Sequence, residues 1–256
     1  MWISRQEAER VERRPDGKMR LVNFTQGQDI MSDTHCSIEP SILYCGTPVV
    51  LISTRNLDGS ANLAPISSVF WLGWRCVLGL AAHSKTTENL IRTGECVVNL
   101  PSETEVGAVD RLACLTGSNP VPPGKVAKGY RYEANKFEAA GLTPIASETV
   151  SPPRARQCPI QMEAVLAAEH GLGEDSPWKG GIKTFEVRIQ RVHALPSLLM
   201  DGHANRIDPD KWRPLIMSFQ KFYGLSQDQV HASRLGDIPE ASYRSPDIDR
   251  ARLVTV

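Results

Sequence analysis

The chain has 256 residues, and its 29 basic and 29 acidic side chains leave it with no net charge. This length is ample for a hydrophobic core that needs no disulfide or metal staple. A neutral chain lacks the positive surface that nucleic acids and anionic lipids select, so both are poor candidates as main partners. No stretch approaches the roughly 18 apolar residues of a membrane span, and the charged N-terminus has no signal-peptide pattern. We expect a soluble, cytoplasmic protein.

The six cysteines are scattered along the chain, with no C-x-x-C pair and no histidines at a ligand spacing. This pattern indicates neither a metal site nor a redox pair. Cys76 and Cys96 lie inside apolar runs and are expected to be small buried hydrophobic residues.

Composition divides the chain into three parts. Residues 1–35 are charged and weakly periodic, and we interpret them as an extended or mobile arm. The Arg/Glu stretch at 5–14 is also compatible with a short exposed helix that the following "RRPDGK" would end. Residues 36–225 carry the core signals and form the predicted domain, whereas 226–256 are too polar and broken for core and form an irregular tail.

Strand signals begin at residue 47. "TPVVLIST" is a continuous apolar and β-branched run, typical of a buried strand, and "NLDGS" supplies Asp58-Gly59 for a tight hairpin turn. The returning strand contains Pro65, which favours a sheet edge or a bulge because proline has no N–H to donate. Further strands are expected at 75–82, 95–101, 159–170 and 182–195, the last with clean alternation.

Helices are expected between and after these strands. Residues 85–94 read as a short helix that ends at Gly94, 103–114 as an amphipathic helix, and 135–144 as one or two turns stopped by Gly141. The segment 115–132 between them is a long Pro/Gly-rich loop. Short antiparallel strands joined by hairpins favour a mainly β barrel with peripheral helices. A doubly wound fold fits poorly, because strands and helices do not alternate and G-x-G-x-x-G is absent.

Two polar segments beside the best strands are candidates for a binding site. Ser84, Thr86 and Thr87 stand where the helix at 85–94 begins, and a helix N-terminus with free N–H groups favours an anion. Lys85 adds a full positive charge suited to phosphate. The alternative is that Ser84 only caps the helix and that Lys85 is solvated.

The second segment is "NLAPISS" at 62–68. Pro65 disturbs the strand pairing there and exposes neighbouring backbone groups at the barrel rim. Asn62, Ser67 and Ser68 could then bond the polar edge of a flat heteroaromatic ring. The alternative is a bulged edge strand whose polar groups are satisfied by its own side chains.

Together these segments resemble the flavin reductase-like family, the FMN-binding split-barrel proteins. The resemblance runs from about residue 42 to 225 and is strongest over 47–101. In that family an N-x-A-P-x-S segment lies along the flavin ring, and an S-x-T-x-x-N-I type segment holds the ribityl phosphate. The first pattern matches Asn62, Ala64, Pro65 and Ser67, and the second matches Ser84, Lys85, Thr86, Thr87 and Asn89.

The resemblance implies an FMN-binding split β-barrel and a homodimer with each flavin near the subunit interface. It also implies hydride transfer from NADH or NADPH to the flavin, with a flavin-dependent monooxygenase as a candidate recipient of the reduced flavin. No catalytic side chain is assigned, because this chemistry belongs to the two cofactors.

One departure from the family pattern keeps two alternatives open. Many members carry a histidine-threonine pair before the strand written here "TFEVRI", and that histidine is associated with nicotinamide. This chain has Lys183-Thr184 instead. It could therefore retain FMN and act on a specific small molecule, under a cover formed by 116–130 and the tail beyond 225. It could also be a non-catalytic FMN-binding electron carrier or sensor.

Overall fold

The computed structural model describes residues 9–13, 19–23 and 35–255, and the chain forms two compact units, Met1–Ser41 and Ile42–Val256. In the first unit, β1 (Glu9–Arg13) pairs antiparallel with β2 (Met19–Asn23). The helix suggested for 5–14 is therefore wrong over 9–13, and its remaining positions lie outside the described residues. A helix this short is marginal in water, whereas the ladder with β2 pairs the backbone groups on one side of the strand.

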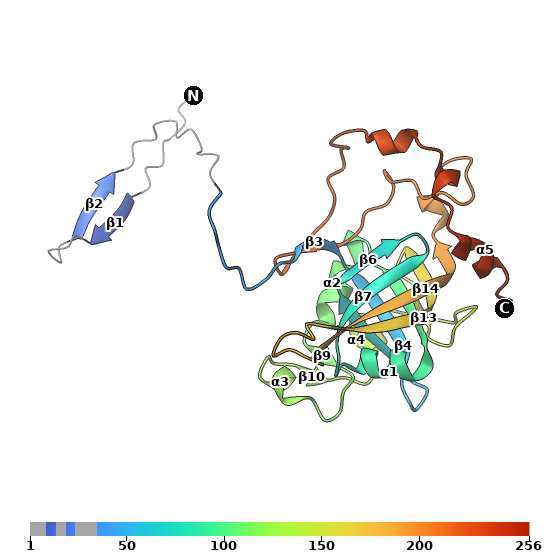
Figure 1. Cartoon of the computed structure of the whole chain (residues 1–256), viewed down its shortest axis with the longest axis horizontal. Coiled ribbons are helices and arrows are strands. Elements are labelled where there is room, and N and C mark those ends of the chain that lie inside the picture. Colours follow the sequence, from blue (N-terminus) through green and yellow to red (C-terminus); the bar gives the residue numbers. More distant parts are fainter. Residues whose placement is uncertain (1–8, 14–18, 24–34, 256) are drawn as a thin grey trace. The chain divides into compact units, whose positions relative to one another are not determined.

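The second unit is built on one seven-stranded sheet in which every neighbouring pair is antiparallel (Figure 1). Its two outermost strands are consecutive in the chain and are joined only by Ser67 and Ser68. Because two residues span so little distance, the two edges of the sheet come together at this connection. In sheet order the strands are β5 (Ala61–Ile66), β4 (Val50–Arg55), β8 (Glu95–Leu100), β13 (Ile160–Leu172), β14 (Ile182–Ala194), β7 (Arg75–Ala81) and β6 (Val69–Leu72).

Smaller sheets accompany this barrel. The predicted strand at 47–54 is in fact two strands in different sheets, since β3 (Cys45–Pro48) belongs to a three-stranded sheet and β4 to the barrel. Between them the Val49 N–H donates to the Leu215 carbonyl at 2.8 Å, so the ladder changes partner there. The other short strands are β9 (Leu115–Thr116), β10 (Arg131–Tyr132), β11 (Pro144–Ile145), β12 (Arg154–Ala155), β15 (Ile216–Ser218) and β16 (Lys221–Tyr223).

The helices are short and lie around the sheet. The helix expected at 85–94 is confirmed as α1 (Lys85–Thr93), capped by Gly94 at φ 70°. The expected helix at 103–114 is shorter and begins with a 3₁₀ turn. No helix in the described parts of the chain is long and apolar enough to cross a membrane. The remaining helical elements are η1 (Glu103–Glu105), α2 (Val106–Arg111), α3 (Pro123–Val126), α4 (Lys136–Ala140), η2 (Pro196–Leu198), η3 (Arg234–Asp237), η4 (Glu240–Tyr243) and α5 (Pro246–Arg252).

Two hydrophobic clusters pack on the sheet, and around β4 and β5 they cover both of its faces. One fills the barrel and includes Leu78, Val98 and Phe185, and the other lies against α2 and α4 and includes Leu51 and Phe137. Burial on both faces explains why β4 is a continuous apolar run and does not alternate. As predicted, Cys76 and Cys96 are fully buried, and burial raises the pKa of the Cys96 thiol to about 12, which keeps it neutral.

Pro65 lies in an edge strand, as predicted, but it makes no bulge. The β4–β5 register runs without a shift past the Leu51/Pro65 pair. The Asn56 N–H donates to the Ser60 carbonyl at 2.9 Å, which fixes which alternate pairs along this ladder exchange hydrogen bonds. Pro65 falls at a position that does not, so its missing N–H points to the open edge and costs the ladder nothing.

The tail after residue 225 is anchored at its end. Helix α5 packs on β14 (Figure 1). The Arg75 guanidinium, on β7, donates to one carboxylate of α5 and one of β14. Its Nε lies 2.7 Å from Asp247 Oδ2 in α5, and its Nη1 lies 2.7 Å from Glu186 Oε1 in β14. This pair of contacts fastens the C-terminal helix to the barrel.

A buried carboxylate fastens the loop at 146–153 to β13. Glu163 is fully buried and accepts hydrogen bonds from the backbone N–H groups of Glu148 and Thr149 (2.8 and 2.6 Å). His193 Nε2 lies 2.8 Å from the same carboxylate, so this histidine has a structural role. Burial acts to raise the pKa of Glu163, but the bonds from His193, Thr149 and the two N–H groups outweigh it and lower the pKa to about 2.

The buried Glu163 carboxylate is expected to make the fold sensitive to acid. A carboxyl group whose pKa is depressed in the folded state stabilises it above the unfolded-state pKa of about 4.3, and this stabilisation is lost as the pH falls towards 2. Glu163→Gln should lower the free energy of unfolding at neutral pH by about 3 kcal/mol and flatten its decline between pH 5 and 2. Urea unfolding at several pH values measures this. Glu148→Gln, an exposed neighbour, is the control, and an equal effect there would contradict the assignment.

Candidate functional site

The N-terminus of α1 keeps two backbone donors free. Ser84 is the N-cap, and its side chain accepts from the Thr87 N–H at 3.1 Å. The first N–H groups of a helix have no intrahelical acceptor, so those of Lys85 and Thr86 remain available to a ligand. The nine-residue helix also adds partial positive charge at this end. The capping role expected as the alternative is therefore present, and it leaves the anion-binding groups unused.

A buried network of hydroxyl and amide groups ties this helix to the sheet. The hydroxyl of Thr54, on β4, accepts from Asn62 Nδ2 at 3.2 Å and from Asn89 Nδ2 at 3.1 Å. Asn62 Nδ2 also lies 3.2 Å from Thr86 Oγ1, and Asn89 Nδ2 donates to Asn56 Oδ1 at 2.8 Å. Thr54, Asn62, Thr86 and Asn89 are all buried. The network thus fixes the edge strand β5, the turn after β4 and the start of α1 in one arrangement.

Three lysines surround this network. Lys85 Nζ lies 2.8 Å from Glu88 Oε2, one turn along α1. Lys136 Nζ, from the start of α4, donates to Asn62 Oδ1 at 3.0 Å. Lys125 Nζ, from α3, donates to Thr116 Oγ1 at 3.1 Å. Burial is the cause of a lowered pKa at Lys125 and the largest cause of one at Lys136.

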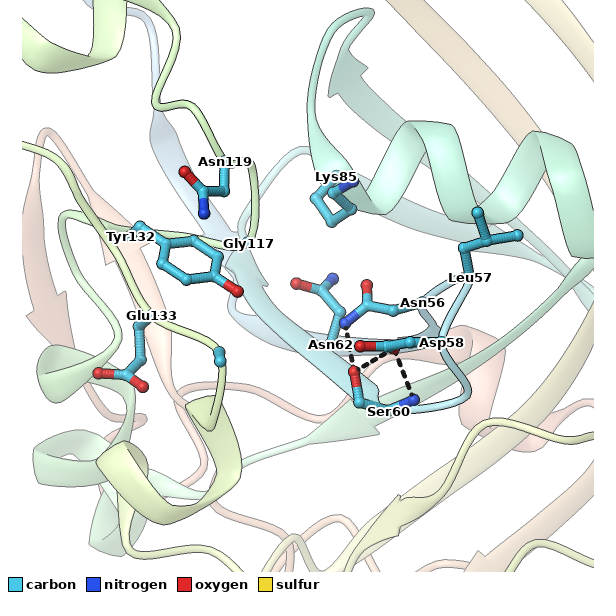
Figure 2. Close-up of a pocket in the computed structure, with 11 residues that line it drawn as sticks. Asn56, Leu57, Asp58, Ser60, Asn62, Lys85, Gly117, Asn119, Tyr132 and Glu133 are labelled. Carbon is cyan, nitrogen blue, oxygen red and sulfur yellow. Dashed lines mark hydrogen bonds between the residues drawn. The ribbon is translucent and has the colours of Figure 1, made fainter.

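A cavity of about 360 Å³ opens beside the network (Figure 2). The turn after β4 and Lys85 lie on one side of it, and Asn119, Tyr132 and Glu133 face them from the loop that precedes α4. Gly117 allows this loop to come close, since a Cβ there would lie 2.7 Å from Asn62 Oδ1 and 3.0 Å from Lys85 Cγ. The cavity is lined by Asn56, Leu57, Asp58, Ser60, Asn62, Lys85, Gly117, Asn119, Tyr132, Glu133 and Ala134.

The open edge of β5 leads from this cavity towards the β5–β6 connection. No strand in the described part of the chain pairs with β5 on that side. Alternate residues of β5 exchange backbone hydrogen bonds with β4, and Leu63 and Pro65 are among those that do not. The N–H and C=O of Leu63 and the C=O of Pro65 therefore point to the open edge. The edge therefore offers alternating donors and acceptors, which is what the polar rim of a heteroaromatic ring requires.

The structure gives the ten candidate residues different places. Asn62 and Lys85 line the cavity, and Thr86 contacts Asn62. The Thr87 hydroxyl donates to the Ala81 carbonyl at 2.8 Å, so it supports the helix start from behind. Asn89 is fully buried in the network. Ser84 caps the helix, and Ala64, Pro65, Ser67 and Ser68 are half-buried along β5 and its connection to β6.

Sequence reasoning missed several parts of this site. The sequence pattern places Thr54 at the end of a buried strand, although a threonine that ends an apolar run beside a turn is a signal for a polar contact. The pattern places Lys136 in a short helix, and only the tertiary structure brings it to Asn62. The loop at 115–132, expected to be irregular, contains α3, and its two ends form the parallel strand pair β9 and β10. It supplies Gly117 and Asn119 to the cavity.

Comparison with known proteins identifies the family. The model of the flavin reductase like domain matches residues 43–208. The chain belongs to this family. The resemblance predicted from the two polar segments is thereby confirmed, and so is the mainly β split barrel with peripheral helices, because flavin reductase-like solved structures share the fold.

Individual relatives extend over most of the chain. The uncharacterized protein YdfE of Bacillus subtilis (strain 168) is 39% identical over 191 residues, which is 75% of this chain and 89% of the relative. Nitrilotriacetate monooxygenase component B from Bacillus cereus is 26% identical with a TM-score of 0.61, over 78% of this chain and all of that one. Flavoredoxin of Desulfovibrio vulgaris (Miyazaki F) has a TM-score of 0.63 at 21% identity, over 79% and 100% of the two chains.

The residues of the site fit a phosphorylated flavin. Two free N–H groups, Lys85 and the nearby Lys136 suit a phosphate at one end, and the open edge of β5 suits the ring at the other. Asn62 belongs to both ends, since it lies on β5 and contacts Thr86. Family membership and these groups together support a flavin-related oxidoreductase.

The Thr54 hydroxyl is expected to hold this site in shape. Thr54→Val keeps the volume and removes the acceptor that Asn62 and Asn89 share, leaving buried amide donors unsatisfied. The flavin-free protein should lose about 1–3 kcal/mol of unfolding free energy, measured by urea denaturation. Thr54→Ser keeps the oxygen and should recover most of that loss. Equal destabilisation by both variants would show that the methyl group, and not the hydrogen bonds, matters.

Proposed function

We propose that this protein is an FMN-dependent oxidoreductase that transfers hydride from NADH or NADPH to the flavin. The observation that carries the proposal is the continuity of the site. Asn62 joins an anion-binding helix start to an open strand edge, so one phosphorylated ring compound can use both.

In this proposal the chain binds and orients, and the flavin when bound supplies the redox chemistry. The N–H groups of Lys85 and Thr86 and the Lys85 ammonium hold the phosphate. The open edge at Leu63 and Pro65, with Ala64, Ser67 and Ser68 beside it, fixes the orientation of the ring. The network under Asn62 keeps these groups in place before the ligand arrives, which lowers the entropic cost of binding.

A homodimer and a flavin-dependent monooxygenase are the proposed partners. The barrel edge strand β6 exposes Phe70 by 52% and Leu72 by 73%, an apolar edge that a second copy could cover. The similarity to a component named for nitrilotriacetate monooxygenase supports supply of reduced flavin to such an enzyme. The cytoplasm, where NADH and NADPH are available, is the proposed location.

A second candidate, an FMN-binding electron carrier or a flavoenzyme with its own small-molecule substrate, is favoured by one observation. Lys183, which takes the place of the nicotinamide-associated histidine of many relatives, lies 3.2 Å from Glu169 on the neighbouring strand. An ammonium group that is paired with a carboxylate is less available to contact a nicotinamide than an unpaired imidazole is. The similarity to a protein named flavoredoxin points the same way.

Mixing the protein with NADH or NADPH in air separates these candidates. The proposed function predicts rapid oxidation of one nicotinamide, stimulated by free FMN and followed at 340 nm. Slow or absent bleaching of a tightly held flavin would favour the second candidate. A colourless protein that ignores added FMN would contradict both.

Lys85→Ala tests the phosphate end of the site. The variant should bind FMN about tenfold more weakly and riboflavin almost unchanged, because only FMN carries the charge that the ammonium contacts. Quenching of flavin fluorescence measures both affinities. Glu88→Gln is the matched control, since it releases Lys85 from its ion pair and should leave FMN binding equal or tighter. An equal loss of both flavins in Lys85→Ala would refute the phosphate assignment.

A further inference from the structure

Lys136 is a buried ammonium group without a carboxylate partner. The residue is 4% exposed, and its Nζ donates to Asn62 Oδ1 at 3.0 Å. None of the ion pairs found within residues 9–13, 19–23 and 35–255 includes it. Burying a charge beside a neutral amide costs free energy, since the amide replaces only part of the lost hydration. Ionisable groups in such unfavourable surroundings are concentrated at functional sites.

The charged groups around Lys136 do not compensate for it. Lys125 repels it from α3, and Glu133 attracts it from the segment before α4. The Glu133 carboxylate accepts from the Asn135 N–H at 2.9 Å and is not in contact with Lys136 Nζ. Across the cavity, Asp58 is held by the N–H and hydroxyl of Ser60, and Lys85 by Glu88. Positive charge therefore remains in excess on the Lys136 side.

The contact with Asn62 connects this charge to the site. A lysine can only donate, so Asn62 must turn its Oδ1 towards Lys136 and its Nδ2 towards Thr54 and Thr86. Asn62 lines the cavity into which Lys85 also faces. Only the Asn62 side chain therefore separates the Lys136 ammonium from the cavity. At this separation the buried charge can attract an anion bound in the cavity.

We propose that Lys136 is a specificity-determining and positioning residue of the flavin site, whose buried charge makes the chain select a phosphomonoester-bearing flavin over its unphosphorylated form. This inference rests on the proposed function and adds a charge that the two family motifs do not contain. The ligand class is a flavin with a terminal phosphate dianion, and the group that responds to it is the Lys136 ammonium.

The buried charge of Lys136 is expected to make FMN binding depend on pH. Burial and then repulsion by Lys125 lower the pKa of Lys136 to about 8, with Glu133 acting in the opposite direction. A phosphate nearby favours the protonated form and raises this pKa again, so binding above pH 8 must take up a proton. FMN affinity should therefore fall as the pH rises from 8 to 9.5. Riboflavin has no phosphate, and its affinity should not follow this decline.

The test compares Lys136→Met and Lys136→Arg with the wild type, using FMN and riboflavin as probes at pH 7 and 9.5. Lys136→Met, which keeps the length and removes the charge, should bind FMN about 10–100-fold more weakly at pH 7 and riboflavin within about twofold. It should also show a smaller decline in FMN affinity between the two pH values. Lys136→Arg keeps the charge and should recover part of the FMN affinity. Lys128→Met removes an exposed lysine of the same loop and is the control.

Two results would overturn the inference while leaving the proposed function in place. One is an equal loss of FMN and riboflavin in Lys136→Met, and the other is an unchanged pH decline in that variant. Circular dichroism checks that the variant folds. If it does not, the wild type decides alone, because parallel pH profiles for FMN and riboflavin contradict the inference. A wild type that binds neither flavin would refute the proposed function and this inference together.

Discussion

The hydroxyl group of Thr54 is the point on which the site depends. It accepts hydrogen bonds from Asn62 on β5 and from Asn89 on α1, two elements that are separated in sequence by the β6–β7 hairpin. Inside the protein such bonds are strong, and a missing partner is costly, so the network admits few alternative arrangements. The position of the α1 N-terminus relative to the open edge of β5 is set in this way.

Electrostatics at the site works against the stability of the empty protein. The α1 N-terminus and Lys85 bring positive charge to the cavity, while Lys136 lies behind Asn62 and Lys125 contacts Thr116, next to the lining residue Gly117. Of the three lysines, only Lys85 has a contacting carboxylate among the described residues. This arrangement raises the free energy of the flavin-free state and is relieved by an anion. Binding and folding are therefore coupled, because a ligand that occupies only the folded state stabilises it.

Local rules predicted most of the elements. Gly94 and Gly141 end α1 and α4 in the left-handed conformation, as glycine after a helical run does, and Asp58-Gly59 forms the hairpin turn. The failures occur where a distant partner decides. β1 replaces a suggested helix because β2 pairs with it, and the run at 47–54 divides because Val49 bonds Leu215, far along the chain. Pro65 makes no bulge because the phase of the ladder, set at the hairpin, leaves its missing donor on the open side.

The sequence by itself determined the mainly β fold, the hairpin around Asp58-Gly59, the start and end of α1 and the two polar segments that indicate a flavin. Each depends on residues close together in the chain, so local chemistry is enough. Only the tertiary structure decided that Thr54 is the shared acceptor, that Gly117 brings the long loop against Asn62, and that Lys136 lies buried behind the cavity wall. Apart from the Thr54–Asn62 bond across the hairpin, these contacts join residues tens of positions apart, and no local pattern encodes which distant side chain will supply a buried charge or a hydrogen bond.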